Sequence, residues 1–150
     1  MRLSKKVILP DSLLDREEIR ELKFAYCNGL DHRDIEGLAE LFASDAIYDL
    51  GKFGSYRGSA EIRRALTELL GSFALTSHTP TIGSIDVDGD RAAATWKALV
   101  AMQAKPKDAS QTATATLAFI DYHDIMVLQD GRWLFSQVRL DFRGEWPIAS

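Results

Sequence analysis

Three polar side chains occur at positions where they could carry out proton transfer: Tyr26, Asp31 and His78. Tyr26 falls on the apolar stripe of a predicted amphipathic helix, and Asp31 closes that helix. His78 precedes Pro80 at the start of the first long predicted strand. An imidazole titrates near pH ~6.5, which suits general acid–base catalysis. These residues are therefore candidates for an acid–base site.

Their spacing also leaves structural roles open. Tyr26 and Asp31 are five residues apart, and because each helical residue turns by about 100°, they do not share one face. They would converge only if the helix end frays or if both reach one cavity. Otherwise Tyr26 is a core tyrosine, Asp31 caps the next helix or pairs with Arg33, and His78 is an ordinary surface histidine.

Familiar catalytic and metal motifs are missing from the sequence. It contains no glycine-rich phosphate loop, no Gly-x-Ser-x-Gly elbow and no His-Glu-x-x-His pair. The histidines, His32, His78 and His123, are widely separated, and their spacing does not indicate a metal site. We expect neither a metal nor an organic cofactor.

The elements that must position these residues follow from hydrophobic periodicity. Helical spacing predicts helices over 13–31, 34–42 and 59–70, capped by Asp11 or Ser12, by Asp34 and by Ser59. Alternation and turn residues predict strands over 46–50, 81–87, 91–104, 112–128 and 133–142. Because Pro80 cannot donate to a sheet ladder, we expect the strand to begin after it, with His78 at the rim of the sheet.

Three helices and then mostly consecutive strands indicate an α+β fold. Asp130-Gly131 is a strong hairpin signal between the last two strands. The tight connections predict a curved, mostly antiparallel sheet that wraps the helices. We expect one domain over residues 15–150, preceded by an N-terminal arm over residues 1–14.

Composition excludes several classes of protein. The chain has 150 residues and a net charge of −4, without a basic cluster, so we expect no nucleic-acid partner. No apolar stretch is long enough to be a membrane span or a secretory signal, and the single cysteine, Cys27, fits a reducing compartment. The sequence therefore predicts a cytoplasmic protein.

A series of short motifs resembles SnoaL-like domains of the nuclear transport factor 2-like superfamily. The resemblance extends from Asp15 to Trp146, and its motifs are Asp15–Leu22, Tyr26, Gly29–Asp34, Leu41–Ala46, Tyr56-Arg57-Gly58, His78, Asp88–Ala92 and Asp130–Trp133. It implies a cone-shaped α+β barrel, in which the helices pack in the hollow of the sheet and leave an apolar pocket.

The branch that this chain resembles includes scytalone dehydratase, the bile-acid dehydratases and hexachlorocyclohexane dehydrochlorinase. The resemblance implies that Asp31 pairs with His78 and that Tyr26 is a catalytic tyrosine. Several relatives carry a second His or Asp on the strand that here reads Lys97–Met102, and this chain lacks it.

The implied activity is a cofactor-independent, dehydratase-type lyase acting on a small hydrophobic cyclic substrate. Tyr48, Trp96 and Phe119 are candidates for the pocket wall, with core packing as the alternative for each. The same pocket could instead serve an isomerase, a cyclase, an epoxide hydrolase or a non-catalytic ligand-binding or structural protein. Apolar sheet surface and the resemblance imply a homodimer or a homotrimer.

Overall fold

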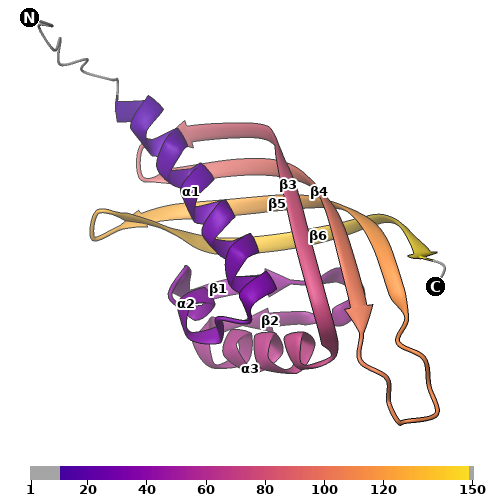
Figure 1. Cartoon of the computed structure of the whole chain (residues 1–150). Helices are drawn as coiled ribbons and strands as arrows, with labels where there is room; N and C mark the ends of the chain where they lie inside the picture. Colours follow the sequence, from indigo (N-terminus) through magenta and orange to yellow (C-terminus); the bar gives the residue numbers. More distant parts are fainter. Residues whose placement is uncertain (1–10, 149–150) are drawn as a thin grey trace, which may run out of the picture.

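The computed structural model describes residues 11–148 of the chain. It contains a six-stranded mixed sheet, in the order β2-β1-β6-β5-β4-β3, with helices on one face (Figure 1). The elements in chain order are α1 (Asp11–His32), α2 (Ile35–Ala39), β1 (Phe42–Asp49), the 3₁₀ turn η1 (Gly51–Phe53), β2 (Ser55–Arg57), α3 (Gly58–Gly71), β3 (Phe73–Asp88), β4 (Arg91–Ala104), β5 (Ala115–Gln129) and β6 (Arg132–Ile148). The predicted α+β class is confirmed.

The pairing of the strands is mostly antiparallel, as expected. The exception is β1, which pairs with β6 in parallel. Between β5 and β6, Asp130 and Gly131 have φ angles of 50° and 74°, so the predicted Asp-Gly hairpin is confirmed. Register shifts within the β5–β6 and β3–β4 ladders bend the sheet around the helices.

The helices differ from their predicted bounds mainly at their ends. Residues 1–10 of the expected arm lie outside the described residues, whereas residues 11–14 belong to α1. Asp34 caps α2 as predicted, by accepting a hydrogen bond from the Gly37 amide. Ser59 is not the cap of α3, because the helix begins one residue earlier and Glu61 accepts the amide of Arg57 instead.

The first long strand is the main correction to the predicted fold. Instead of beginning after Pro80, β3 starts at Phe73, so His78 lies well inside the strand. Pro80 is tolerated because β3 is an edge strand, where only one side of the backbone meets a neighbouring strand. His78 therefore has a fixed position on the sheet opposite Val100.

The core lies between α1 and the sheet. Figure 1 shows α1 crossing the face of the strands, while α2 and α3 gather near β1 and β2. Every second residue of β4 from Ala92 to Val100 is buried, and α1 presents Ile19, Tyr26 and Leu30 toward that surface. This packing brings the C-terminal end of α1 against β3.

Candidate active site

The end of α1 is held close to the beginning of β3 by Arg33. This residue has a left-handed backbone conformation, with φ at 58°, and follows the last helical residue. Its guanidinium donates hydrogen bonds to the carbonyl oxygen of Phe73 at 2.8 Å and to that of Asp31 at 3.4 Å. The contact fixes where the Asp31 side chain leaves the helix.

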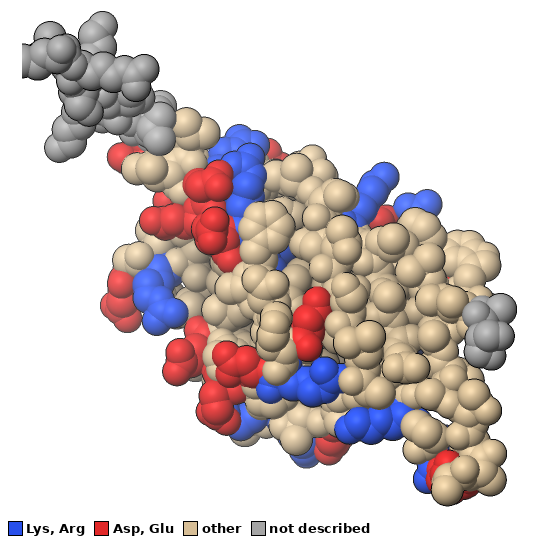
Figure 2. Space-filling view, viewed as in Figure 1, with Lys and Arg blue, Asp and Glu red and all other residues tan. Residues whose placement is uncertain are grey.

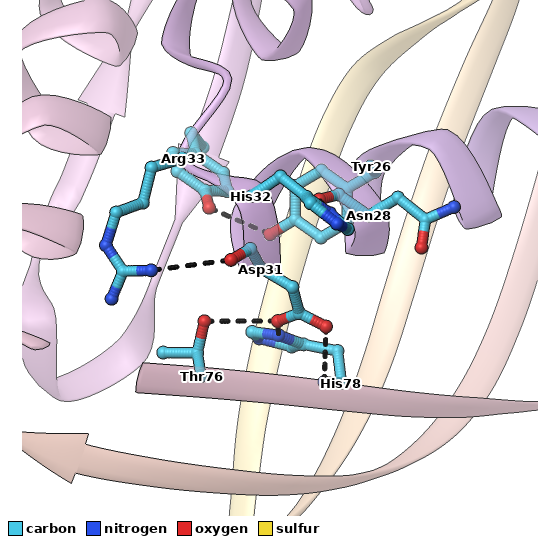
Figure 3. A network of polar contacts seen from close by, with 8 residues as sticks. Tyr26, Asn28, Asp31, His32, Arg33, Thr76 and His78 are labelled. Atoms are coloured by element: carbon cyan, nitrogen blue, oxygen red, sulfur yellow. Dashed lines mark hydrogen bonds and ion pairs between the residues drawn. The ribbon is translucent and has the colours of Figure 1, made fainter. Parts of the chain in front are cut away.

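Strand alternation directs Thr76 and His78 to the side of β3 that faces this helix end. The Asp31 carboxylate accepts bonds from the Thr76 hydroxyl at 3.1 Å, the His78 amide at 2.9 Å and the His78 Nδ1 at 2.6 Å (Figure 3). An aspartate at a helix end thus meets a histidine 47 residues later in the chain.

These hydrogen bonds determine the charge state of the pair. Burial would raise the pKa of Asp31, but the bonds from His78 and Thr76 outweigh it and lower that pKa below its usual range. Asp31 is therefore ionised at neutral pH. A carboxylate on Nδ1 keeps the proton on that nitrogen, which leaves Nε2 of His78 as the basic nitrogen.

His78 lines a partly open apolar cavity beside this pair. The volume that the centres of water molecules can occupy in this cavity is about 40 Å³. The whole space between the surrounding protein atoms, including the open mouth, is about 460 Å³. Its wall consists of Tyr26, Leu30, Tyr48, Leu50, Phe53, Leu69, Leu70, Phe73, Thr76, His78, Val100, Met102, Ile120, Tyr122, Leu140 and Phe142. None of these side chains is a carboxylate, an ammonium or a guanidinium group.

Three phenols, Tyr26, Tyr48 and Tyr122, lie in the wall, and two of them are hydrogen-bonded to each other. The Oη atoms of Tyr26 and Tyr48 are 2.8 Å apart, and both side chains are fully buried. Burial, reinforced by neighbouring phenols, raises the pKa of Tyr26 well above its ordinary value, and burial likewise raises that of Tyr48. Both are neutral at physiological pH. Because one phenol donates to the other, a single hydroxyl proton of the pair stays available for a bound molecule.

The described part of the chain offers little to hold a metal. Residues 11–148 contain no group of three His, Cys, Asp or Glu side chains that could bind an ion. No helix of that part is long and apolar enough to cross a membrane.

Comparison with known proteins places this fold and site in a family. The model of the SnoaL-like domain matches residues 11–139, which include α1, β3 and most of the cavity wall. The chain belongs to the SnoaL-like family.

Solved structures with the same fold include proteins named as a dehydrochlorinase and as a dehydratase. A hexachlorocyclohexane dehydrochlorinase, LinA type 2, superposes with a TM-score of 0.83 at 22% identity, covering 93% of this chain and 92% of that one. A scytalone dehydratase-like protein from Novosphingobium aromaticivorans gives 0.80 at 23% identity, covering 93% and 91%. At such identities the likeness establishes the fold, and it is the nuclear transport factor 2-like fold that the sequence indicated.

A curated relative is closer in sequence and has no assigned activity. It is an uncharacterized protein of Mycobacterium tuberculosis, 31% identical over 91 residues. The match covers 60% of this chain and 62% of the relative, so the chain spans less than two thirds of the length of that protein.

Within this SnoaL-like domain, the six sequence-predicted site residues do not all meet. Tyr26, Tyr48 and His78 line the cavity, and Asp31 reaches it through His78. Trp96 is buried but lies outside the cavity wall, beside the ammonium group of Lys23.

The expectation that Phe119 lines the pocket was wrong. Phe119 is 46% exposed and packs against Trp146 on the outer face of the sheet. Side chains alternate between the two faces of a strand, and Phe119 falls on the solvent-facing side, where it pairs with Leu99 of β4.

Sequence reasoning missed two features near the site. Thr76 precedes His78 by two residues, and the period of a strand would have placed both on one face once the strand was known to include them. Lys23 sits three residues before Tyr26 on the buried stripe of α1 and pairs with Asp124 at 2.9 Å. A lysine within an otherwise apolar stripe was the available signal.

Proposed function

We propose that this protein is a cofactor-independent lyase that removes a small leaving group, such as water, from a neutral hydrophobic ring compound. The observation that carries the proposal is the Asp31–His78 pair opening on an apolar cavity. A partly buried carboxylate bound to Nδ1 makes Nε2 a positioned general base. The dehydrochlorinase and dehydratase names of proteins with this fold support the same reaction class.

In the proposed reaction, Nε2 of His78 takes a proton from a carbon next to a carbonyl or another activating group. The electron pair of the broken C–H bond forms the new double bond, and the leaving group departs from the adjacent carbon with its bonding pair. Asp31 stays ionised and stabilises the imidazolium that forms. His78 returns its proton to solvent or to the departing group, which closes the cycle without a metal or an organic cofactor.

The phenol pair supplies the complementary acid function. Tyr26 and Tyr48 share one hydrogen bond and keep one hydroxyl proton free. That proton can stabilise an oxygen on which negative charge develops, or a departing hydroxyl group. The high pKa of both phenols keeps them in the protonated state that this role requires.

The lining restricts the chemistry of the substrate. A carboxylate or a phosphate ester would enter a cavity whose wall carries no Lys or Arg side chain, so its desolvation cost would be large. Aromatic and aliphatic side chains instead favour a neutral, flat ring. We therefore place charged metabolites outside the substrate class.

The decisive experiment uses a panel of neutral cyclic β-hydroxy ketones, with loss of water followed by absorbance of the conjugated product. His78→Gln and Asp31→Asn should each lower the rate by about 10²- to 10⁴-fold with the fold intact. Tyr26→Phe should cost less, because a water molecule can partly replace the phenol.

The chain provides a matched control for the pair. His123 Nε2 lies 3.1 Å from Asp141 on the exposed face of the sheet, so His123→Gln removes a second His–Asp pair without touching the cavity. That variant should keep full activity. If His78→Gln retained the wild-type rate, or if the product had gained or rearranged atoms without losing water, the dehydration proposal would be wrong. Rearrangement would indicate an isomerase or a cyclase, and binding without turnover a ligand-binding protein.

A further inference from the structure

We propose that the short segment Gly51–Gly54 is a gate over the cavity, and that Phe53 sets the size of the molecules that it admits. The segment comprises η1 and Gly54, between β1 and β2. The proposal concerns access to the cavity and does not depend on the reaction proposed above.

In this structure the cavity is too small for a ring compound. The volume of about 40 Å³ that water centres can occupy has room for only a few water molecules, at about 10–15 Å³ each. Pockets that bind organic ligands usually measure about 300–1,000 Å³. Side chains in the wall must therefore move before such a molecule can enter.

Phe53 stands where movement costs least. It lines the cavity and is still 37% exposed, so one part of its ring faces the interior and another faces solvent. Its ring meets Phe142 edge-on, with 5.6 Å between the centroids. Leu50 and Leu140, also in the wall, are almost completely buried. Displacing Phe53 uncovers the cavity without opening the core.

Glycines stand at both ends of the segment. Gly51 and Gly54 have φ angles of 58° and 106°, a region that favours glycine. A Cβ atom at Gly54 would lie 2.9 Å from the hydroxyl of Tyr56. The Leu50 amide donates to the Gly54 carbonyl at 2.8 Å, which joins the two ends of the segment. The Tyr56 hydroxyl of β2 also donates to the Phe53 carbonyl at 2.8 Å, so opening of the segment must break this bond as well.

A weak latch holds this segment closed. The Lys52 ammonium contacts both carboxylate oxygens of Glu145 on β6, at 2.5 and 2.6 Å. It also lies 5.2 Å from the ring centroid of Phe53 and 4.9 Å from that of Phe142. Both partners are partly exposed, and exposed ion pairs are weak and screened by salt. The latch can therefore open reversibly.

The experiment measures how fast diethyl pyrocarbonate, a small uncharged reagent for neutral imidazole, reaches His78. The parent protein carries His32→Gln and His123→Gln, which leaves His78 as the single histidine of the chain. The side chain of His78 is 9% exposed, so its reaction reports opening of the cavity. Absorbance of the carbethoxylated ring gives the rate, and no substrate is needed.

Glu145→Gln should raise the rate about two- to fivefold, the range that loss of an exposed ion pair allows. Phe53→Ala should raise it further, because the ring that closes the mouth is gone. Salt should accelerate the reaction of the parent but not that of Glu145→Gln. Asp121→Asn is the control, since it breaks another exposed ion pair of β6, with Arg143 at 2.8 Å, away from the cavity.

Two results would overturn the proposal. In the first, Glu145→Gln and Phe53→Ala both react at the rate of the parent. In the second, Asp121→Asn accelerates the reaction as much as Glu145→Gln does, which would mean that any loosening of β6 exposes His78.

Discussion

At the scale of single residues, the Asp31 carboxylate organises the site. It accepts hydrogen bonds from a side-chain hydroxyl, a backbone amide and an imidazole. Each bond favours the ionised form, and together they overcome the effect of burial on its pKa. The orientation of His78 therefore depends on a carboxylate that is itself held by three hydrogen bonds.

Of these three hydrogen-bond donors, Thr76 is the simplest to test. Thr76→Val keeps the shape of the side chain but removes the hydroxyl bond to Asp31. We expect the pKa of Asp31 to rise and the rate of the proposed reaction to fall about tenfold, the effect of a charge-assisted hydrogen bond of about 1.5 kcal/mol. Carboxyl ¹³C NMR and the pH–rate profile measure the two effects.

Two further variants separate the hydroxyl from the packing at this position. Thr76→Ser keeps the hydroxyl and should restore most of the rate. Thr79→Val changes an exposed threonine on the opposite side of β3 and should have no effect. An unchanged Asp31 pKa in Thr76→Val would remove Thr76 from the site.

The stability of the protein in acid should also depend on Asp31. Its pKa is lower in the folded state than in the unfolded state, where an aspartate titrates near pH ~3.9. Its contribution to stability is thus complete above that value and is lost as the pH falls through the folded-state pKa. Between about pH 5 and pH 2, urea unfolding of Asp31→Asn should show a shallower loss of stability than wild type. Parallel curves would contradict this assignment.

At the scale of elements, α1 is attached to the sheet by more than apolar contacts. Lys23 and Asp124 form an ion pair at 2.9 Å, and both side chains are completely buried. The Lys23 ammonium lies 3.6 Å from the ring centroid of Tyr122 and 4.8 Å from that of Tyr26. Burial raises the pKa of Asp124, and the charge of Lys23 opposes that rise. The pair thus links α1 to β5 directly behind two phenols of the cavity.

Breaking this pair from one side should be costly. Lys23→Met leaves a buried carboxylate without its cation, and the free energy of unfolding should fall by about 3–5 kcal/mol. The double variant Lys23→Met/Asp124→Leu removes both charges and should recover most of that loss. Urea denaturation measures both changes.

The exposed pair of Arg20 with Glu17 is the control on the same helix. Arg20→Gln should change stability by no more than about 1 kcal/mol. A double variant as unstable as Lys23→Met alone would show that the two charges do not act as a pair.

At the scale of the whole molecule, the outer face of the sheet exposes two large aromatic side chains. Figure 2, viewed from the side of α1, shows that charged side chains gather over the helices on that side. On the outer face, Phe119 and Trp146 are 46% and 53% exposed, with their rings 5.3 Å apart, and Leu99 pairs with Phe119 across the strands. The ion pair of Asp121 with Arg143 adds both signs of charge beside them. Such a surface can complement a second copy of itself.

We therefore expect the chain to form a homodimer or a homotrimer through this face. The double variant Phe119→Ser/Trp146→Ser should weaken association at least about tenfold in sedimentation equilibrium, the loss expected of two central aromatic contacts. Phe24→Ser removes a comparably exposed ring from α1, at 44%, and should not change association. A wild-type protein that sediments as a monomer at every concentration would contradict this expectation.

Local sequence patterns were sufficient for most of the architecture. Helical and alternating periodicity identified three helices and the long strands, and Asp130-Gly131 identified the hairpin, because these signals are contained within a few residues. The strand β3 was only half found, since a proline marks its middle and only its edge position makes that proline acceptable.

The residue types of the candidate site could likewise be selected from the sequence, but their assembly could not. Tyr26, Asp31 and His78 were candidates by type and position, and the resemblance to SnoaL-like domains favoured a catalytic role for them over a structural one. Lys23 and Thr76 were overlooked because their partners lie far along the chain. Which face of the sheet Phe119 and Trp96 occupy could be decided only from the actual strand register, because a shift of one residue exchanges the inner and outer faces.

The sequence by itself determined which groups are present and which local elements carry them. Only the tertiary structure decided that Asp31 meets His78, that the cavity is only partly open and that Phe53 stands at its mouth, because these depend on contacts between elements distant in sequence.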